Sequence, residues 1–142
     1  MNLPADKIIS CFYDSAEDCV KVLDASATLL SFNDKGYAAM EIDDPKQVIG
    51  SNWLDFWKGD MVPRAQKAFE QALGGRTAAF EGYCPTAKGT PRWWRVNIVP
   101  LKNEFDEVQW LLAMSRDVSE IVRLREENES LRKRLISIPQ PA

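Results

Sequence analysis

The stretch EVQWLLAMSRDVSEIVRLREENESLRKRLISI, residues 107–138, changes its hydrophobic period part-way along. Residues 107–116 follow the two-residue period of a β-strand. Asp117-Val-Ser-Glu120 then fits a capping box, with Asp in place of Ser or Thr, and predicts the start of a helix. Beyond it the apolar residues recur at spacings of three and four, which is the rhythm of a coiled coil. The stretch therefore predicts a strand that runs directly into a coiled-coil helix.

One polar residue interrupts the predicted coiled-coil seam. The seam positions are Ile121, Leu124, Asn128, Leu131, Leu135 and Ile138. A single Asn at such a position weakens a coiled coil but favours two parallel strands in register. In that register Glu120 of one chain faces Arg125 of the other, and Glu127 faces Arg132 in the same way. Each exposed pair contributes about 0.5 kcal/mol, and fewer than three heptads form only a weak dimer alone. The pattern predicts a parallel homodimer; the alternative is one amphipathic helix folded back on its own domain.

Composition narrows the classes of function. The 142 residues carry a net charge of −3 and scattered basic residues, so we expect no nucleic-acid binding by this segment. No apolar run reaches membrane-spanning length and no signal-peptide pattern opens the chain, so we expect no membrane contact and a cytoplasmic location. The chain has no histidine, which excludes Ser-His-Asp and Cys-His catalysis and histidine-ligated haem or metal. Three unclustered cysteines argue against a disulfide framework or a zinc site.

Upstream of residue 107 the pattern alternates between short strands and helices. Strands are predicted at 19–23, 28–32, 77–84 and 92–101, and helices or helical turns at 3–16, 34–42, 43–50, 53–57 and 60–73. This order predicts an α+β fold, in which helices cover one face of a five-stranded antiparallel sheet. The predicted division is a flanking helix at 1–16, a sheet domain at 17–117, the coiled coil at 118–138 and a Pro-containing tail at 139–142.

Four short sequences along the chain resemble those of PAS domains. They are Leu29-Leu-Ser-Phe-Asn33, Val48-Ile-Gly50, Lys88-Gly-Thr-Pro-Arg-Trp-Trp94 and Ser115-Arg-Asp-Val-Ser-Glu120. The last is similar to the D-[IV]-T-E ending common in that family, with Ser for Thr. In this order and at this spacing they resemble a PAS domain over about residues 10–120. The resemblance implies a sensory or interaction module whose sheet curls around the middle helices and whose last strand leads into a helix that pairs with its twin.

The resemblance also implies where a ligand would lie. With the family's inward positions as a guide, the ligand-pocket candidates are Trp53, Phe56, Phe80, Cys84, Trp94, Val96, Ile98, Ala113 and Ser115. Trp53 and Trp94 could sandwich a flat organic ligand or cover a cationic group. The alternative, which we favour, is that these aromatic side chains fill the core.

The sequence predicts no cofactor. The light-sensing branch of the family carries Gly-x-Asn-Cys, whose Cys attacks a flavin, but here Gly50-Ser-Asn52 is followed by Trp53. Cys84-Pro85 matches a haem-regulatory dipeptide only superficially, and Pro85 is explained as a strand-ending residue. We therefore expect neither a flavin adduct nor haem, and no metal, while a small organic ligand stays open. Cys11 is a candidate for a disulfide between subunits, although a reducing cytosol opposes it.

Two surfaces are predicted to carry a signal out of the domain. The outer face of the last strand is too apolar for bulk water, and the flanking helix of the same or the partner chain is predicted to cover it. Besides the seam, the predicted dimer interface contains Ile8, Ile9, Phe12, Trp110, Leu112 and Met114. The predicted relay residues are Arg116, Asp117, Ser119 and Glu120. Asp117 is predicted to cap the helix and to pair with a nearby Arg or Lys.

The predicted function is that of a non-enzymatic sensory and dimerisation module in signal transduction or transcriptional regulation. Its partners would be a second copy of the chain and a downstream effector domain or protein. One alternative is a ligand-free protein-interaction adaptor whose pocket is packed solid. Another is a small-molecule enzyme on a similar fold. For that enzyme the sequence offers no convincing acid–base pair, since Asp43-Asp44 lies at a helix-start turn.

Overall fold

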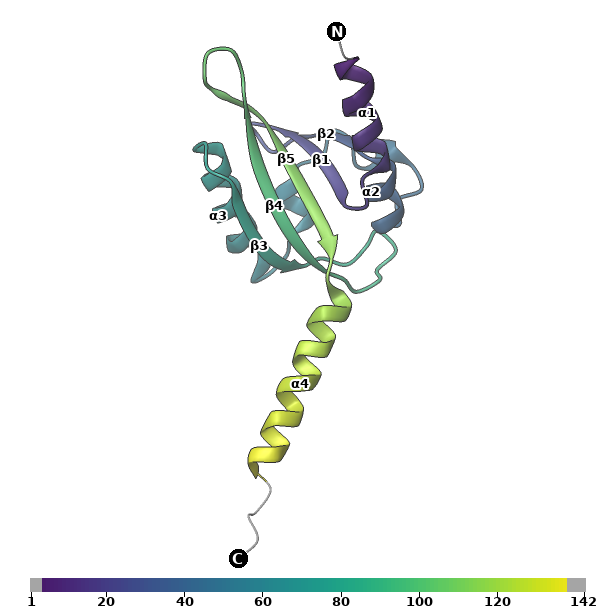
Figure 1. Ribbon diagram of the computed structural model, residues 1–142, viewed down its shortest axis with the longest axis vertical. Helices are drawn as coiled ribbons and strands as arrows, with labels where there is room; N and C mark the ends of the chain where they lie inside the picture. Colours follow the sequence, from purple (N-terminus) through teal and green to yellow (C-terminus); the bar gives the residue numbers. More distant parts are fainter. Residues whose placement is uncertain (1–3, 138–142) are drawn as a thin grey trace, which may run out of the picture.

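A computed structural model describes residues 4–137 of the chain (Figure 1). Its elements in chain order are α1 (Ala5–Ser15), β1 (Cys19–Asp24), β2 (Leu29–Phe32), α2 (Asp34–Ala39), η1 (Pro45–Gln47), η2 (Trp53–Phe56), α3 (Met61–Leu73), β3 (Ala78–Tyr83), β4 (Trp93–Lys102), β5 (Val108–Asp117) and α4 (Ser119–Ser137). The last predicted seam position, Ile138, and the predicted tail at 139–142 lie outside the described residues.

The five strands form one antiparallel sheet in the order β2-β1-β5-β4-β3. β1 and β2 form a hairpin, β3 to β5 form a meander, and β5 joins the two by pairing with β1 as well as β4. Ser115 of β5 therefore lies opposite Cys19 on one side and Val96 on the other. This arrangement confirms the predicted α+β fold class.

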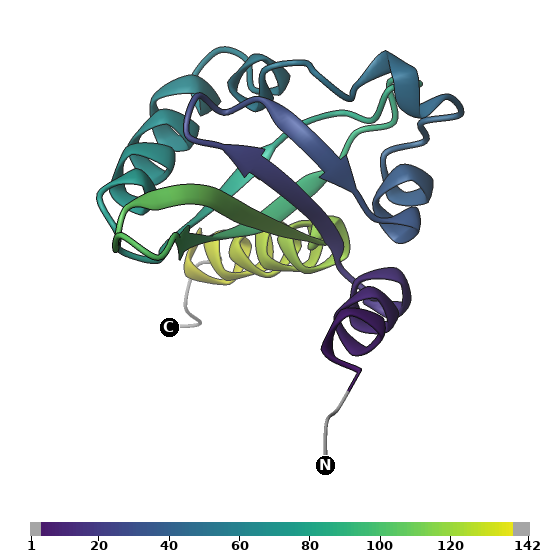
Figure 2. The same ribbon diagram turned by 90° about the horizontal axis from the view of Figure 1, so that it is seen from above.

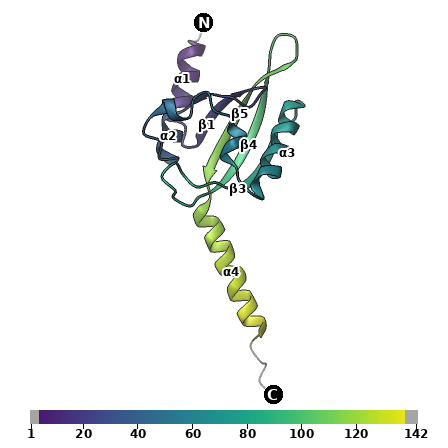
Figure 3. The same cartoon turned by 180° about the vertical axis from the view of Figure 1, so that it is seen from behind.

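The helices between β2 and β3 lie on one face of the sheet. Figures 2 and 3 show α2 and α3 on that side. α4 begins at Ser119, directly after β5 ends at Asp117, and it extends away from the sheet (Figure 1). The last strand and the projecting helix are thus almost continuous along the chain.

Local sequence accounts for where two of the helices begin and end. The Asn33 side chain accepts a hydrogen bond of 3.0 Å from the Gly36 N–H and caps α2, as predicted. α3 ends at the predicted glycine pair, where Gly75 adopts a φ of +95°. The Arg76 N–H then donates to the Gln71 carbonyl, which is the long-range bond of a Schellman motif.

Alternation along the central strands builds the core against these helices. Trp94, Val96 and Ile98 of β4 are at most 2% exposed, whereas Arg95 and Asn97 between them face solvent. A strand that is apolar on one face and polar on the other packs in only one register, because a shift of one residue would expose the whole apolar set.

α1 lies beside α2 and does not cover the outer face of β5 within one chain. It is held by Tyr13, whose carbonyl accepts a hydrogen bond of 3.0 Å from Asn33 Nδ2. Its apolar side chains stay in solvent, with Ile9 at 66% and Phe12 at 72% exposed. All six predicted interface residues on the two elements remain at least partly exposed: Ile8, Ile9, Phe12, Trp110, Leu112 and Met114. Cover of β5 by α1 of the same chain is therefore wrong, and cover by α1 of a partner chain stays a prediction.

Candidate functional site

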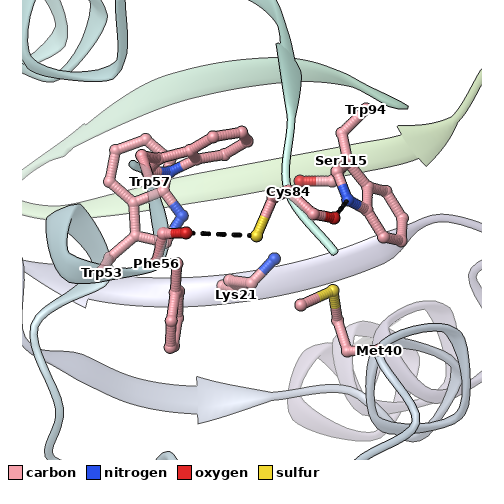
Figure 4. A pocket seen from close by; sticks show the side chains of 8 residues that line it. All are labelled: Lys21, Met40, Trp53, Phe56, Trp57, Cys84, Trp94 and Ser115. Carbon is pink, nitrogen blue, oxygen red and sulfur yellow. Dashed lines mark hydrogen bonds between the residues drawn. The ribbon is translucent and has the colours of Figure 1, made fainter. Parts of the chain in front are cut away.

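A small space, here called the inner cavity, lies between the sheet and η2 (Figure 4). It is lined by Lys21, Met40, Trp53, Phe56, Trp57, Cys84, Trp94 and Ser115. The volume open to a water-sized molecule is ≈10 Å³, which is about the room that one water needs. The side chains of the domain therefore nearly fill its interior.

Five of the predicted pocket residues meet at the inner cavity: Trp53, Phe56, Cys84, Trp94 and Ser115. The other four belong to the hydrophobic core around it: Phe80, Val96, Ile98 and Ala113. Among these, Phe80 packs edge-on against the rings of Trp53 and Trp57.

Three residues of the cavity wall are absent from the sequence-based set: Lys21, Met40 and Trp57. The two-residue period of β1 places Lys21 on the same face as Cys19 and Leu23, both buried, and this signal could have located it. Met40 and Trp57 follow short helical turns, where no period predicts a direction, so tertiary packing alone brings them to the cavity.

Lys21 is the only charged side chain in the inner-cavity wall formed by the described residues. The residue is 4% exposed. Its Nζ donates a 3.1 Å hydrogen bond to Cys19 Sγ and lies 4.7 Å from the centre of the Phe32 ring. Figure 4 shows the Lys21 amine directed into the space beside Cys84.

The Cys84 thiol is held as a buried, protonated group. Burial raises the pKa of this thiol, and the smaller opposing effects of Lys21 and Lys58 do not reverse the shift. Its Sγ donates to the Phe56 carbonyl at 3.2 Å, and Trp94 Nε1 donates to the Cys84 carbonyl at 2.8 Å. Because only a thiolate is strongly nucleophilic, this geometry favours a structural role for Cys84.

Trp53 fills the interior at the position where the light-sensing pattern places a reactive thiol. It is 1% exposed and packs against the rings of Trp57, Phe69 and Phe80. A flavin or a porphyrin needs a pocket of roughly 300 Å³ or more, so neither fits the inner cavity. Among residues 4–137, no three His, Cys, Asp or Glu side chains gather to form a metal site.

A larger space, here called the outer cleft, adjoins the inner cavity and opens to solvent. Its volume open to water is ≈240 Å³. Its wall is mostly apolar and contains Phe32, Met40, Ile42, Val48, Asp55, Phe56, Lys58, Cys84, Pro85, Thr86 and Ala87. Met40, Phe56 and Cys84 line both spaces and form the partition between them.

A set of hydrogen bonds, here called the junction network, joins β4 and β5 to the first turn of α4. An Arg92 guanidinium nitrogen lies 2.7 Å from Asp117 Oδ2. Asp117 Oδ1 accepts from the Ser119 N–H at 2.9 Å and from the Ser119 hydroxyl at 2.6 Å. Trp93 completes the network, because its N–H donates to Ser119 Oγ at 2.9 Å and its carbonyl accepts from the Val118 N–H at 2.8 Å.

Asp117 supports the start of α4 through Ser119 and not through the predicted capping box. A capping box would have Asp117 accept from the N–H of Glu120, but the bonds found among the described residues run to Ser119. Partial burial raises the pKa of Asp117, but hydrogen bonds from Ser119 and the charge of Arg92 outweigh it. The net pKa therefore lies below its ordinary value.

The two other predicted relay residues lie outside the junction network. Arg116 forms an exposed ion pair with Asp18, with Nε 3.0 Å from Oδ1. Glu120 lies 4.0 Å from Arg123 on α4 itself. Exposed pairs of this kind contribute little to stability, so Asp117 and Ser119 make the stronger contacts among the four predicted relay residues.

The fold is shared with known proteins. A sequence profile described as the PAS fold matches residues 13–123, which is more than half of the chain. The chain belongs to the PAS-fold family. No curated protein matches it.

Solved structures share the fold of this PAS domain at low sequence identity. The PAS domain of an HTR-like protein from Haloarcula marismortui is 21% identical, with a TM-score of 0.66 over 80% of this chain and 91% of that one. An RNA-binding light-oxygen-voltage receptor is 19% identical, with a TM-score of 0.80 over 94% of this chain and 39% of that one. A domain of a sensory box sensor histidine kinase/response regulator from Geobacter sulfurreducens is 17% identical, with a TM-score of 0.68 over 80% of this chain and 94% of that one.

The helix that leaves this PAS domain exposes its apolar stripe. The apolar seam residues that the structure describes are 49% to 67% exposed: Ile121, Leu124, Leu131 and Leu135. The polar seam residue Asn128 is exposed as well. Burial on α4 is confined to Val122, in the first turn of the helix. A helix folded back on its own domain would bury its apolar stripe, so that alternative is wrong. Within the chain, Arg125 pairs with Glu81 of β3 at 3.1 Å. Neither α4 nor another helix within residues 4–137 is long and apolar enough to cross a bilayer.

Proposed function

We propose that this chain is a sensory and dimerisation module of a signalling protein, and that it passes a change in the sheet into a parallel coiled coil of two α4 helices. The observation that carries the proposal is the exposed apolar stripe on α4, joined to β5 through the junction network. An apolar stripe on a projecting helix gains free energy only when it is buried, and a second copy of the same helix offers a matching stripe.

The named relatives support a role in signalling. One belongs to a sensor histidine kinase/response regulator and another to a light-oxygen-voltage receptor. The module acts in the cytoplasm without catalysis of its own, and its output goes to an effector domain or to another protein.

Arg125 provides a route by which the sheet affects the coil. In the single chain it pairs with Glu81, whereas the parallel dimer offers it Glu120 of the partner subunit. A movement of β3 that weakens the pair with Glu81 releases Arg125 for the other chain. Dimer stability then depends on the state of the sheet, although one exposed pair contributes only about 0.5 kcal/mol.

Disulfide trapping tests the parallel register. Leu131→Cys is placed in a Cys11→Ser background, because Cys11 is the exposed native thiol and Cys19 and Cys84 are buried. We expect mild oxidation to give a covalent dimer, since a parallel, in-register coil brings residue 131 of both chains together. Lys133→Cys, at an outer position of the same helix, is the matched control. Equal trapping at both positions, or a monomeric mass at high micromolar concentration, would contradict the proposal.

A second function, that of a ligand-free interaction adaptor, is favoured by the nearly filled inner cavity of ≈10 Å³. In that case the partner surface is the outer face of β5, where Trp110 is 38% exposed. Native mass spectrometry of freshly purified protein separates the two functions, because a sensor retains or takes up a small molecule and an adaptor does not.

A further inference from the structure

Lys21 is a buried amine without a carboxylate partner among the described residues. None of the ion pairs within residues 4–137 includes it. Its hydrogen-bond acceptor is the Cys19 sulfur, and a thiol is a weak acceptor for one of the three donors that an ammonium carries. A charge removed from water in this way is costly unless an anion pairs with it. The interior of the domain therefore attracts a negative charge.

A second donor in the same wall also lacks a partner. Trp57 Nε1 is buried and has no acceptor within the described residues. The Ser115 hydroxyl lines the same cavity, whose described wall contains no Asp or Glu. Two nitrogen donors and a hydroxyl thus belong to residues that line one space, and a buried donor left without an acceptor costs free energy.

The room for the rest of a ligand lies next to this space. Among the described residues, those that line both the inner cavity and the outer cleft of ≈240 Å³ are Met40, Phe56 and Cys84. Methionine is unbranched and has three rotatable bonds, so Met40 is the side chain of the partition that repacks most easily. Its movement would join the two spaces into one pocket that is donor-rich at its inner end and apolar toward the cleft.

We infer that Lys21 is the anchor of a binding site for a small monocarboxylate with an apolar body. The carboxylate would accept hydrogen bonds at the Lys21 end of the inner cavity, and the apolar body would replace Met40 and extend into the outer cleft. One ammonium matches one negative charge, so a dianion such as a phosphate monoester would keep a buried charge unpaired. This inference deepens the proposed sensory function and rests on it.

The site has a direct connection to the proposed output. Ser115 lies on β5 two residues before Asp117, which holds the first turn of α4. A carboxylate that draws Ser115 and Lys21 together acts on β5 and on β1, which pair at Cys19 and Ser115. Binding at the inner end of the pocket therefore acts on β5, the strand that leads into α4.

Matched pairs of acid and amide test the inference on the unmodified 142-residue chain. The probes are indole-3-acetate and octanoate, each compared with its carboxamide by calorimetric titration and by tryptophan fluorescence. We expect each carboxylate to bind about ten- to a hundredfold more tightly than its amide, because only the acid brings a full negative charge to the Lys21 ammonium, whereas the amide offers a neutral carbonyl oxygen. Three tryptophans line the inner cavity, so binding there also changes their emission.

Substitutions of single lysines test where the carboxylate binds. Lys21→Met keeps most of the side-chain volume and removes the amine, and we expect it to reduce carboxylate affinity at least tenfold while amide affinity stays the same. Lys67→Met on the exposed face of α3 is the matched control. Lys58→Met reports on an anion bound at the rim of the outer cleft instead.

Several results would overturn the inference. They are equal affinity for acid and amide, loss of binding in Lys58→Met but not in Lys21→Met, and no binding of either carboxylate at millimolar concentration. The acid–amide comparison needs no variant, so the inference stays testable if Lys21→Met does not fold. Disulfide trapping at residue 131 is independent of these measurements. A trapped dimer without carboxylate binding would leave the proposed function standing and reject the inference alone.

Discussion

The Arg92 guanidinium lies 2.7 Å from the Asp117 carboxylate, and this pair ties the residue before β4 to the last residue of β5. The same carboxylate holds Ser119 at the start of α4. A change in the spacing of β4 and β5 must therefore alter the contacts that hold the helix. The pair is only partly exposed, with 30% and 36% of the two side chains in solvent, so water screens it less than a surface pair.

Asp117→Ala tests the junction network. The variant loses both the bond to Arg92 and the support of Ser119, and we expect it to lower the free energy of unfolding by about 1 kcal/mol and to reduce helix content. The measurements are chemical denaturation and far-ultraviolet circular dichroism. Asp43→Ala, which removes one exposed partner of Lys88, is the matched control. Unchanged melting and unchanged helix content in Asp117→Ala would show that the network does not support α4.

The pH dependence of stability should reflect the lowered pKa of Asp117. Because the folded-state pKa lies below the unfolded value of about 4, the ionised carboxylate stabilises the fold above that value. This contribution is lost as pH falls through the folded pKa. We expect Asp117→Asn to be less stable than the native chain at neutral pH and the difference to shrink toward about pH 3.

A second carboxylate also affects stability at acid pH, and its effect must be separated from that of Asp117. The pKa of Glu41 is also lowered, chiefly by hydrogen bonds from Thr90 and Thr86. Glu41→Gln measured alongside Asp117→Asn resolves the two effects. A stability difference for Asp117→Asn that stays constant from neutral pH to pH 3 would argue that its ionisation is not linked to folding.

Gly82→Ala tests how tightly the interior is packed. A methyl group at this buried position would lie 2.6 Å from a ring carbon of Trp57, so the indole has to move. We expect a loss of about 1–3 kcal/mol in the free energy of unfolding, together with a changed tryptophan emission. Gly74→Ala is the control, because its nearest added contact is 3.4 Å and its φ is −76°. Equal stability of the two variants would mean that space beside Trp57 is greater than the structure indicates.

Leu131→Glu tests the seam without touching the domain. Leu131 is 50% exposed in the single chain, so a charge there should leave the melting of the domain unchanged. In a coiled coil it would bury two like charges at one layer, and we expect dimer affinity to fall at least tenfold, which is about 1.4 kcal/mol. Sedimentation equilibrium measures the change. Ser130→Glu adds the same charge at an outer position, and a similar loss of affinity in both variants would rule out the predicted seam.

Elements and their ends could be predicted because they depend on neighbours in the chain. The Asn33 cap, the glycine pair after α3 and the change of period at Asp117 each involve residues only a few positions apart. The same locality explains the alternation along β4 and β5, which is a property of each strand's own backbone, whereas the resemblance to PAS domains indicated which of the two faces points inward.

The candidate site depends on contacts between residues that are far apart in the sequence, and no local pattern predicts such contacts. Arg92 and Asp117 are 25 positions apart, and only the pairing of β4 with β5 makes the first the partner of the second. The alternation of β1 could place Lys21 on the inward face of the sheet. The lack of a carboxylate near it, however, depends on all the elements that pack against that face. Periodicity and capping thus specified the strands, the helices and the exposed stripe of α4, because those signals act over one or two turns of chain. Tertiary packing alone settled the cavity volume, the partition at Met40 and the surroundings of the Lys21 amine, because these arise where segments distant in sequence meet.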